Sequence, residues 1–476
     1  MTQSKAIEVI NDHIKYFREN KNDLSYVPID LDLAVTDTPN PKSNPMQEGN
    51  KINTPLMFLS GGAGTGKSWI IRKLSKKYKN SIVVLSSTML SAINIEGQTL
   101  HSFFKLGINK DVEALKMSDQ YFTEKTKAPI YALTHSIKKV LTECELLVID
   151  EISMVSKETL QMIFYRIKQT KVQCPPILFT GDLFQLPPVK GVSIIHHPVF
   201  QNNIIPLFLT ENMRTGGDKK FANLLRRWRV GMYRDEDESY FESRIIEPQE
   251  NTIRLMSTNS QIDAYNNQKL TENPNTLVTL SPKVSKVINN KKVDGMVKQF
   301  VNTISNPLYL KVSSLVVFTR NASPTEDYQY YNGERAIVRK ILSNSVELSP
   351  LSNLEYTITL NIATEYIEEF VVDTNKGGIS KNILAQIDYY PLKLGYATSI
   401  HKAQGMSLDS IYLSEPNFFA NGQAYVALSR LTNHKGLFLS DQDVKDAIIL
   451  NLKRGNDEIY RWYLETLNTL DERKQI

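Results

Sequence analysis

Hydrophobic and polar positions follow two different patterns along the chain. From residue 55 onward, short apolar runs are separated by stretches with helical periodicity; the runs read LMFL, SIVVLSS, ELLVID and PILFTGD. Short apolar runs between amphipathic helices are typical of a parallel sheet that is covered on both faces. A polar stretch at 105–142 interrupts the pattern, so we expect a small insert there.

The pattern changes between about residue 280 and residue 390. Helical periodicity fades, and the segments LKVSSLVVFTR, ERAIVRKILS and NLEYTITLNI predict β-strands joined by turns. The α/β pattern returns with PLKLGYATSIHKAQG and continues to the end. The chain is therefore predicted to form two α/β units, the second split by a β-rich insert. The polar stretch at 36–54, with three prolines, is expected to be a linker or a surface insertion.

Bulk composition narrows the class of protein only slightly. The 476 residues are 41% hydrophobic and 22% charged, which is ordinary globular usage. No run of about 18 apolar residues occurs, and MTQSKAIEVINDHIKYF reads as an amphipathic helix, so we expect neither a membrane span nor a secretory signal. The net charge of +5 permits nucleic-acid binding without requiring it. Cys144 and Cys174 are too few for a disulfide framework or a zinc site, so we expect free thiols in a reducing, cytoplasmic compartment.

The segment GGAGTGKS fits the pattern G-x-x-x-x-G-K-[ST] of a phosphate-binding loop. An apolar strand precedes it and a helix, KSWIIRKLSKKYK, follows it, which lets backbone N–H groups and a helix N-terminus surround phosphates. We expect Lys67 to reach the β- and γ-phosphates of ATP and the Ser68 hydroxyl to bind Mg²⁺. The predicted nucleotide-binding residues are Gly61, Gly62, Ala63, Gly64, Thr65, Gly66, Lys67 and Ser68.

A second acidic site follows where the apolar run of ELLVIDEIS ends in two carboxylates. Asp150, at the end of a strand, can hold Mg²⁺ through water, and Glu151 can orient and deprotonate the attacking water. Together with the phosphate-binding loop, this pair predicts NTP hydrolysis. Kinases, transporters and motors share both sites, so the sites do not reveal what the hydrolysis drives.

Three residues further along the chain are candidates for contacting the γ-phosphate. Gln185 follows the predicted strand ILFTGD, where a polar side chain beside the catalytic strand can sense that group. Arg214 in LTENMRT and Arg430 in AYVALSR carry guanidinium groups, whose planar fork meets phosphate oxygens in pairs. Such an arginine stabilises transition-state charge and is worth about 10³ to 10⁵ in rate. For either arginine alone, a surface salt bridge is the commoner role.

These segments occur together in the order of a known set of motifs. GGAGTGKS, VIDEIS, GDLFQLPPV, LTENMRT, ATSIHKAQGMS and YVALSR resemble motifs I to VI of superfamily 1 helicases, in order and in approximate spacing. The residues of these motifs are most similar to those of the 5′-to-3′ branch, which contains the RecD-like, Dda-like and petite-integration-frequency enzymes. SSTMLSAINIEGQTLHSFF, FANLLRRWRVG and MSTNSQIDAYN resemble further segments of that branch, so the resemblance covers roughly residues 55 to 440.

The resemblance implies an α/β fold with two RecA-like P-loop NTPase domains and ATP and Mg²⁺ between them. Arg214 and Arg430 then belong to the second domain or its boundary, and domain closure completes the site. The implied activity is an ATP-dependent DNA helicase, with DNA-stimulated ATPase activity, that moves 5′-to-3′ on single-stranded DNA and unwinds duplex. The implied domains are the first at 1–205, with its insert at 105–142, and the second at 206–285 and 391–476, with a β-rich small-barrel insert at 286–390.

The resemblance also implies which side chains meet the nucleic acid. The segment YATSIHKAQGMS contacts both ligands in this family, with Gln404 and Gly405 toward the nucleotide. Of Phe103 and Phe104, we expect one to be core, and we choose Phe103 for stacking on a base. Gln3 takes the place of a glutamine that reads adenine, although its distance from the loop is longer than in the family. The implied DNA-binding residues are Thr88, His101, Phe103, Thr398, His401 and Lys402.

The implied partners are single-stranded DNA and duplex junctions, with single-strand-binding or replisome proteins as further candidates, no membrane, and a monomeric motor. Three other interpretations stay open: a translocase that strips proteins or serves a recombination or nuclease complex without net unwinding, an inactive RecA-like DNA-binding subunit, and an RNA helicase of the same superfamily. The inactive subunit is disfavoured because the chain retains Lys67, Asp150, Glu151, Gln185, Arg214 and Arg430.

Overall fold

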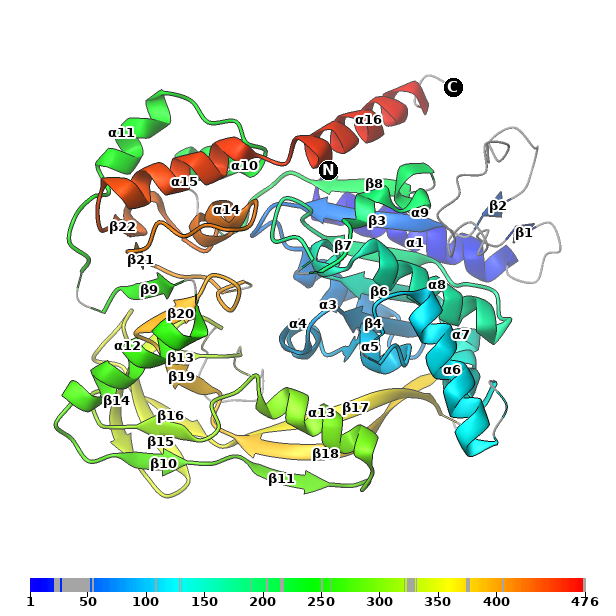
Figure 1. The fold of residues 1–476 in the computed structure, drawn as a ribbon, viewed down its shortest axis with the longest axis horizontal. Helices are drawn as coiled ribbons and strands as arrows, with labels where there is room; N and C mark the ends of the chain where they lie inside the picture. The colour runs from blue at the N-terminus through cyan, green and yellow to red at the C-terminus, as the bar shows by residue number, and fades with distance from the viewer. Residues whose placement is uncertain are drawn as a thin grey trace. The chain divides into compact units, whose positions relative to one another are not determined.

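The computed structural model divides the chain into two compact units (Figure 1). Unit 1 comprises Met1–Glu211, Glu369–Asn382 and Asp457–Ile476, and unit 2 comprises Asn212–Glu368 and Ile383–Asn456. Most of the predicted linker at 36–54 lies outside the residues that the structure describes. The described residues are 1–20, 26–27, 52–53, 55–107, 109–127, 129, 131–188, 190–202, 204–214, 218–249, 251–256, 258–320, 322, 330, 332–373, 377–404 and 406–473.

A six-stranded parallel sheet forms the centre of unit 1, with the strand order β5-β4-β6-β7-β3-β8. Strands β3, β4, β6 and β7 are buried along their whole length, which is why each reads as an uninterrupted apolar run. Because the strands are parallel, the segments that follow them meet at one edge of the sheet. The strands are β3 (Leu56–Gly61), β4 (Ile82–Ser86), β5 (Gln98–Thr99), β6 (Leu146–Asp150), β7 (Ile177–Gly181) and β8 (Ile204–Leu209), with a separate short pair β1 (Tyr26–Val27) and β2 (Ile52–Asn53).

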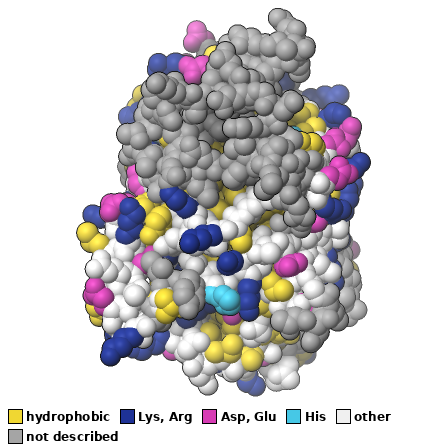
Figure 2. Space-filling model, turned by 90° about the vertical axis from the view of Figure 1, so that its right-hand side faces the viewer, with side chains coloured by type: hydrophobic (Ala, Val, Ile, Leu, Met, Phe, Trp, Pro, Cys, Tyr) yellow, Lys and Arg dark blue, Asp and Glu magenta, His cyan; other side chains and the backbone are white. Residues whose placement is uncertain are grey.

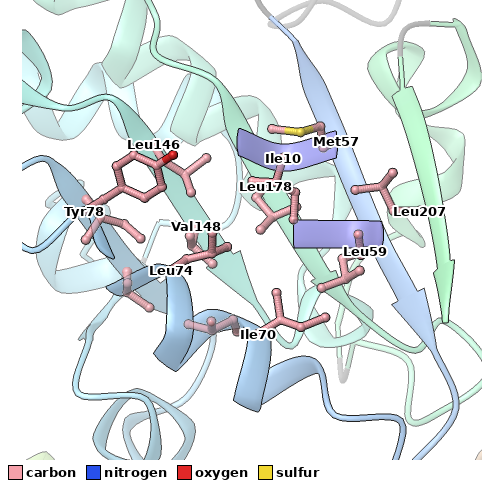
Figure 3. Packing of buried hydrophobic residues seen from close by; sticks show 14 of the residues in the cluster. Ile10, Met57, Leu59, Ile70, Leu74, Tyr78, Leu146, Val148, Leu178 and Leu207 are labelled. Carbon is pink, nitrogen blue, oxygen red and sulfur yellow. The ribbon is translucent and has the colours of Figure 1, made fainter. Parts of the chain in front are cut away.

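The N-terminal helix α1 (Gln3–Asn20) packs with α3 (Lys67–Lys77) against this sheet. Figure 3 shows Ile10 of α1, Ile70 and Leu74 of α3, and Met57 and Leu59 of β3 within one buried cluster. Burying one such side chain contributes about 1.5–3 kcal/mol. The amphipathic segment at the N-terminus therefore forms a helix whose apolar face packs into the core. The remaining helices of the first part of the chain are α4 (Met89–Asn94), α5 (Leu100–Phe103), η1 (Ile152–Met154), α8 (Lys157–Thr170), η2 (Ile194–His196) and α9 (Pro198–Asn202).

The predicted insert at 105–142 contains two helices, α6 (Val112–Thr126) and α7 (Tyr131–Glu143). A buried ion pair fastens α6 to α8. Arg166 Nη1 and Nη2 donate to the two carboxylate oxygens of Asp119 at 2.6 and 2.7 Å, and the side chains are only 2% and 3% exposed. Arg166 also donates to the carbonyl oxygens of Phe104 and Lys105 at 3.1 and 3.2 Å, which connects α8 to the chain where the insert begins.

Unit 2 contains a four-stranded parallel sheet with the order β20-β9-β21-β22. This second parallel sheet agrees with the α/β pattern that resumes near residue 391. Its strands are β9 (Ile253–Met256), β20 (Ala397–Ser399), β21 (Ile411–Leu413) and β22 (Leu437–Leu439), and the helices around this part of the chain are α10 (Lys219–Arg229), α11 (Glu236–Glu242), α12 (Asn259–Glu272), α14 (Gln423–Leu428), η3 (His434–Gly436) and α15 (Gln442–Arg454).

The predicted β-rich segment is an antiparallel sheet with the order β16-β15-β14-β13-β19. Its core includes Val316, Phe318, Val338 and Leu348, all buried. The elements of this segment are β10 (Val278–Leu280), β11 (Lys283–Lys286), α13 (Lys291–Val301), β12 (Leu308–Leu310), β13 (Leu315–Phe318), β14 (Arg335–Ile341), β15 (Ser345–Pro350), β16 (Ile358–Asn361), β17 (Ala363–Val372), β18 (Ile379–Tyr389) and β19 (Leu392–Leu394).

The end of the chain departs from the predicted domain limits. The sequence pattern assigns 391–476 to the second domain, whereas helix α16 (Asp457–Arg473) belongs to unit 1. Burial of apolar side chains explains this assignment. Ile459, Trp462 and Tyr463 recur at helical spacing and are only 3%, 7% and 8% exposed. The far part of the β17–β18 pair, Glu369–Asn382, also belongs to unit 1.

Three further features bear on the expectations from composition: the distribution of surface charge, the apolarity of the helices and the state of the cysteines. On the face drawn in Figure 2, Lys and Arg side chains are interspersed with hydrophobic, acidic and uncharged groups. Within the described ranges, no helix has both the length and the apolarity needed to cross a bilayer. Cys144 and Cys174 are free and buried, as expected, and burial raises the pKa of the Cys144 thiol to about 12.

Candidate nucleotide site and nucleic-acid interface

The phosphate-binding loop joins β3 to α3 at the carboxyl edge of the unit 1 sheet. Gly64 and Gly66 adopt φ values of 78° and 88°, a conformation that favours glycine. A Cβ atom at Gly61 would lie 2.5 Å from Thr65 Oγ1, so the close turn requires glycine there as well. No side chain caps the N-terminus of α3 at Gly66, which leaves its first N–H groups directed at a ligand site.

Lys67 and Gln3 both donate to carbonyl oxygens of this loop. Lys67 Nζ lies 2.7 Å from the oxygen of Gly61 and 3.1 Å from that of Gly62, where phosphate oxygens would be stronger acceptors. Gln3 Nε2 donates to the oxygen of Thr65 at 2.9 Å, despite the long intervening stretch. Packing of α1 against α3 thus brings Gln3 to the nucleotide loop, and its reading of adenine stays a prediction.

The two predicted carboxylates follow β6 directly. Asp150 is 4% exposed and accepts a hydrogen bond from the Thr180 hydroxyl at the end of β7. Burial raises the pKa of Asp150, while the Thr180 hydrogen bond and the positive charge of Lys67 act in the opposite direction. A cation beside Asp150 would favour its charged form. Glu151 adopts the left-handed conformation, with φ 54° and ψ 48°, which is strained for this residue and is a feature that concentrates at functional sites.

Gln185 is held by Asp182, a residue that the sequence interpretation did not include. Asp182 is 1% exposed; its Oδ1 accepts from the backbone N of Phe184 at 3.2 Å, and its Oδ2 accepts from Gln185 Nε2 at 3.4 Å. The backbone N of Gln185 donates to the Asp182 carbonyl at 2.9 Å. The Gly-Asp step after the predicted strand ILFTGD was the available signal, because Asp at this position can cap the turn that follows.

Arg214 and Arg430 lie together in unit 2, beside Ser429. Arg214 Nη1 donates to the Ser429 carbonyl at 2.8 Å, and Arg430 Nη2 donates to Ser429 Oγ at 2.8 Å. Arg430 is 2% exposed, so the alternative role of a surface salt bridge, which is common for arginine, does not apply to it. Burial, and then the positive charge of Arg430, lowers the pKa of Arg214 to about 9. Two neighbouring cations, Arg430 buried and Arg214 partly buried, favour an anion between them.

The polar residues of the segment 396–407, which includes β20, differ in how far their side chains are exposed. Thr398 is 9% exposed, within the sheet, so its side chain is less accessible than its predicted DNA contact requires. Lys402 is exposed and its backbone N donates to Ser399 Oγ at 3.0 Å. The backbone N of Gln404 donates to the His401 carbonyl at 3.2 Å, whereas Gly405 lies outside the described residues.

An aromatic residue missing from the sequence interpretation lies beside His401. The ring of Phe419 is stacked on His401, with centroids 6.1 Å apart and planes at 16°, and the side chain is 69% exposed. Burial lowers the pKa of His401, so this ring is neutral at neutral pH. The doublet Phe418-Phe419 before an Asn-Gly turn was a weak signal, since either ring could have been core; Phe418 is 9% exposed.

The DNA-binding residues predicted in unit 1 differ in accessibility. Thr88 caps α4, where its Oγ1 accepts from the Ser91 backbone N at 3.2 Å. His101 is exposed, although desolvation by neighbouring atoms lowers its pKa. Phe104 is fully buried, as expected for a core ring, and Phe103 is only 6% exposed in this structure, so its predicted contact with DNA stays a prediction.

Phe103 is buried because two aromatic rings pack on it. It makes edge-to-face contacts with Phe104 at 4.9 Å and with Phe370 at 6.3 Å between centroids. Phe370 is close to the far end of β17, and its backbone N donates to Gln98 Oε1 at 3.4 Å. Stacking of Phe103 on a base stays a prediction that requires Phe370 to leave this ring.

Comparison with known proteins shows the family of this chain. A family model for PIF1-like helicases matches residues 46–239. ATP-dependent DNA helicase Pif1 of Campylobacter jejuni is 35% identical over 402 residues, which cover 79% of this chain and 87% of that protein. The chain belongs to the PIF1-like helicase family. The ATP-dependent DNA helicase Pif1 of Bdellovibrio bacteriovorus is a further relative of this PIF1-like chain, 28% identical over 406 residues that cover 83% of the chain and 86% of the relative.

Solved Pif1 structures share the fold of this PIF1-like chain. Bacteroides sp Pif1 in complex with ADP-AlF4 has a TM-score of 0.70 at 23% identity and covers 86% of this chain and 94% of its own. Pif1 helicase from Candida albicans has a TM-score of 0.60 at 25% identity and covers 87% and 96%. The predicted fold of two RecA-like domains is thereby confirmed.

Proposed function

We infer that this PIF1-like chain is an ATP-dependent DNA helicase, a DNA-stimulated ATPase that moves 5′-to-3′ on single-stranded DNA and unwinds duplex. This inference is supported chiefly by the observation that the residues predicted to act on ATP belong to two different units. Unit 1 has the phosphate-binding loop with Asp150 and Glu151, and unit 2 has the buried guanidinium group of Arg430 and the partly buried one of Arg214. The Campylobacter and Bdellovibrio relatives are named ATP-dependent DNA helicases, and a Bacteroides Pif1 has been solved with single-stranded DNA.

The residues of unit 1 bind ATP and prepare the attacking water. The N–H groups of the loop and the Lys67 ammonium bind the β- and γ-phosphates. The Ser68 hydroxyl and the Asp150 carboxylate are hard oxygen ligands of the kind that Mg²⁺ prefers, and Mg²⁺ neutralises developing phosphate charge when bound. Glu151 orients and deprotonates the water, and Gln185, held by Asp182, contacts the γ-phosphate.

The residues of unit 2 complete the site only when the two units close on ATP. Arg214 and Arg430 then stabilise the charge of the transition state, and hydrolysis removes the γ-phosphate that they bind. Closure is therefore favoured by ATP and disfavoured by the products, which makes the pair of units a two-state element driven by nucleotide. Alternating grips by His101 in unit 1 and by His401 and Lys402 in unit 2 move the chain along the strand.

The decisive experiment measures strand separation on tailed duplexes. We expect ATP turnover to rise many-fold with single-stranded DNA, and a duplex with a 5′ tail to open while one with a 3′ tail does not. Opening of the 3′-tailed duplex alone would contradict the assigned polarity. DNA-stimulated ATP turnover without opening of either duplex would instead support a translocase that strips proteins. Absence of any stimulation by DNA would contradict the motor function.

A further inference from the structure

The C-terminal helix α16 reaches the carboxyl edge of the unit 1 sheet, where the catalytic segments begin (Figure 1). Its residue Tyr463 is 8% exposed and contacts three neighbouring strands or their continuations. The Tyr463 hydroxyl is hydrogen bonded to Ser60 Oγ, in β3 and next to the first residue of the phosphate-binding loop. The ring is stacked on Phe184, after β7, at 5.1 Å and 28° between planes, and packs on Phe208 of β8 at 5.2 Å.

The strand register shows why these contacts converge. Ser60 is paired with Gly181 of β7 and with Phe208 of β8, so the three strands end side by side. The chain after Gly181 forms the turn that carries Phe184 and Gln185. One aromatic side chain thus bridges the start of the phosphate-binding loop and the turn that presents the γ-phosphate sensor.

Phe184 is fixed from two sides, and this determines where Gln185 lies. On one side Asp182 Oδ1 accepts from the backbone N of Phe184, and on the other the Tyr463 ring covers the phenyl ring. Gln185 is the next residue, 7% exposed, with its backbone N bonded to the Asp182 carbonyl. Because Phe184 and Gln185 are consecutive residues, a change in the backbone at Phe184 would also move Gln185.

Several contacts hold Tyr463 itself in place. The neighbouring Trp462 donates from Nε1 to the Phe200 carbonyl at 3.2 Å, and its ring packs on Phe58 at 6.0 Å. His196 Nε2 lies 2.9 Å from Glu458 Oε1 near the start of α16. The first two turns of the helix are therefore attached to β3, α9 and η2 of unit 1.

We propose that Tyr463 is a positioning residue of the ATPase site, which orients Gln185 toward the γ-phosphate through its stack on Phe184. It touches neither ATP nor the water. The proposal rests on the inferred ATP hydrolysis and assigns that reaction a residue outside the helicase motifs. It also gives α16, which follows α15 of unit 2 after only Gly455 and Asn456, a role in the reaction of unit 1.

The test uses the full chain with two substitutions of graded severity. Tyr463→Phe removes the hydroxyl bound to Ser60 and keeps the stack, whereas Tyr463→Leu removes both. We expect DNA-stimulated kcat to fall roughly 3- to 30-fold in the leucine variant and less in the phenylalanine variant. The affinity for ADP should be unchanged in both, since ADP lacks the phosphate that Gln185 contacts. Leu464→Ala, on the 41% exposed side of the same helix, is the matched control and should keep full kcat.

A double-mutant cycle separates positioning from general stability. In a Gln185→Ala background, both Tyr463 substitutions should have no further effect on kcat, because the residue through which Tyr463 acts is gone. Losses that multiply in the double variants, or a fall in ADP affinity, would overturn the proposal. If Tyr463→Leu does not fold, Phe184→Leu, which removes the same stack from the other side, takes its place in the cycle. Wild-type protein without DNA-stimulated turnover would contradict the helicase function itself, a separate outcome.

Discussion

At the scale of single residues, the nucleic-acid interface depends on side chains that remain accessible after folding. Phe419 is 69% exposed beside His401, whereas Phe103 is 6% exposed. An aromatic face in water that adjoins a predicted DNA-contacting residue is suited to stacking on a base. The accessible ring in unit 2 therefore has a stronger structural case for base stacking than the one chosen from sequence.

We expect Phe419→Ala to weaken binding of single-stranded DNA by about 1–3 kcal/mol, the typical value of one base–aromatic stack. ATP turnover without DNA should be unchanged. Fluorescence anisotropy with a labelled oligonucleotide at fixed salt measures the affinity. Tyr356→Ala, another exposed aromatic residue of unit 2 at 44% exposure, serves as the control. Equal affinities for Phe419→Ala and wild type would contradict the stacking role.

A second residue, Lys393, makes stability depend on pH. Its Nζ donates to the Thr303 carbonyl, and burial, followed by the charge of Lys402, lowers its pKa from 10.5 to about 8. Above pH 8 the unfolded chain holds this proton and the folded chain releases it. The free energy of unfolding should therefore rise between pH 8 and 10.5, by about 3 kcal/mol.

Lys393→Met should remove this rise and stabilise the protein below pH 8. Urea denaturation at several pH values across the window measures both effects. Lys340→Met, at an exposed lysine of β14, should leave the slope as in wild type. Identical slopes for Lys393→Met and wild type would show that Lys393 is not the titrating group.

At the scale of elements, the α6–α7 insert is fastened by a buried ion pair. Arg166 of α8 and Asp119 of α6 are 2% and 3% exposed, and Gln169 Oε1 accepts from Arg166 Nη1 at 2.8 Å. Removing one partner of a buried pair leaves the other charge without compensation. The orientation of the insert relative to α8 therefore depends on two side chains from distant parts of the chain.

We expect Asp119→Leu to lower the free energy of unfolding by about 3–5 kcal/mol, because Arg166 would remain buried and charged. The double variant Asp119→Leu with Arg166→Met should recover most of this loss. Urea unfolding of both single variants and the double variant measures the coupling. Additive losses in the double variant would show that the two side chains do not act as a pair.

At the scale of the whole molecule, the predicted catalytic residues are divided between the two units. The phosphate-binding loop belongs to unit 1, and the guanidinium pair belongs to unit 2. ATP binding and ATP hydrolysis should therefore be separable by substitution. A change in unit 2 can remove transition-state stabilisation while unit 1 still binds the nucleotide.

Arg430→Lys should lower DNA-stimulated kcat by about 10³-fold or more and leave binding of a fluorescent ADP analogue intact, because an ammonium group cannot replace the guanidinium fork. Thermal unfolding checks that the buried lysine is tolerated. Arg226→Lys, at an exposed position of α10, is the control for unit 2. Full turnover by folded Arg430→Lys protein would exclude this arginine from the reaction.

The chemistry of the nucleotide site could be predicted from sequence because it is carried by contiguous segments. The glycines at 64 and 66 permit the left-handed turns of the loop, and the apolar runs that end at Asp150 and Gly181 identify the strands that precede the acidic pair and Gln185. Hydrophobic periodicity likewise predicted two α/β units with a β-rich segment in the second. These features depend on residues a few positions apart, so local patterns are sufficient.

Tertiary structure alone decided which distant side chains meet and which stay accessible. Folding brings Gln3 to Thr65 and Tyr463 to Phe184, buries Phe103, and assigns α16 to unit 1. Apolar spacing shows that a helix such as α16 must cover something, but not which surface it covers. That choice depends on the packing of side chains far apart in sequence, because burial free energy is non-directional and complementarity exists only after the sheets have formed.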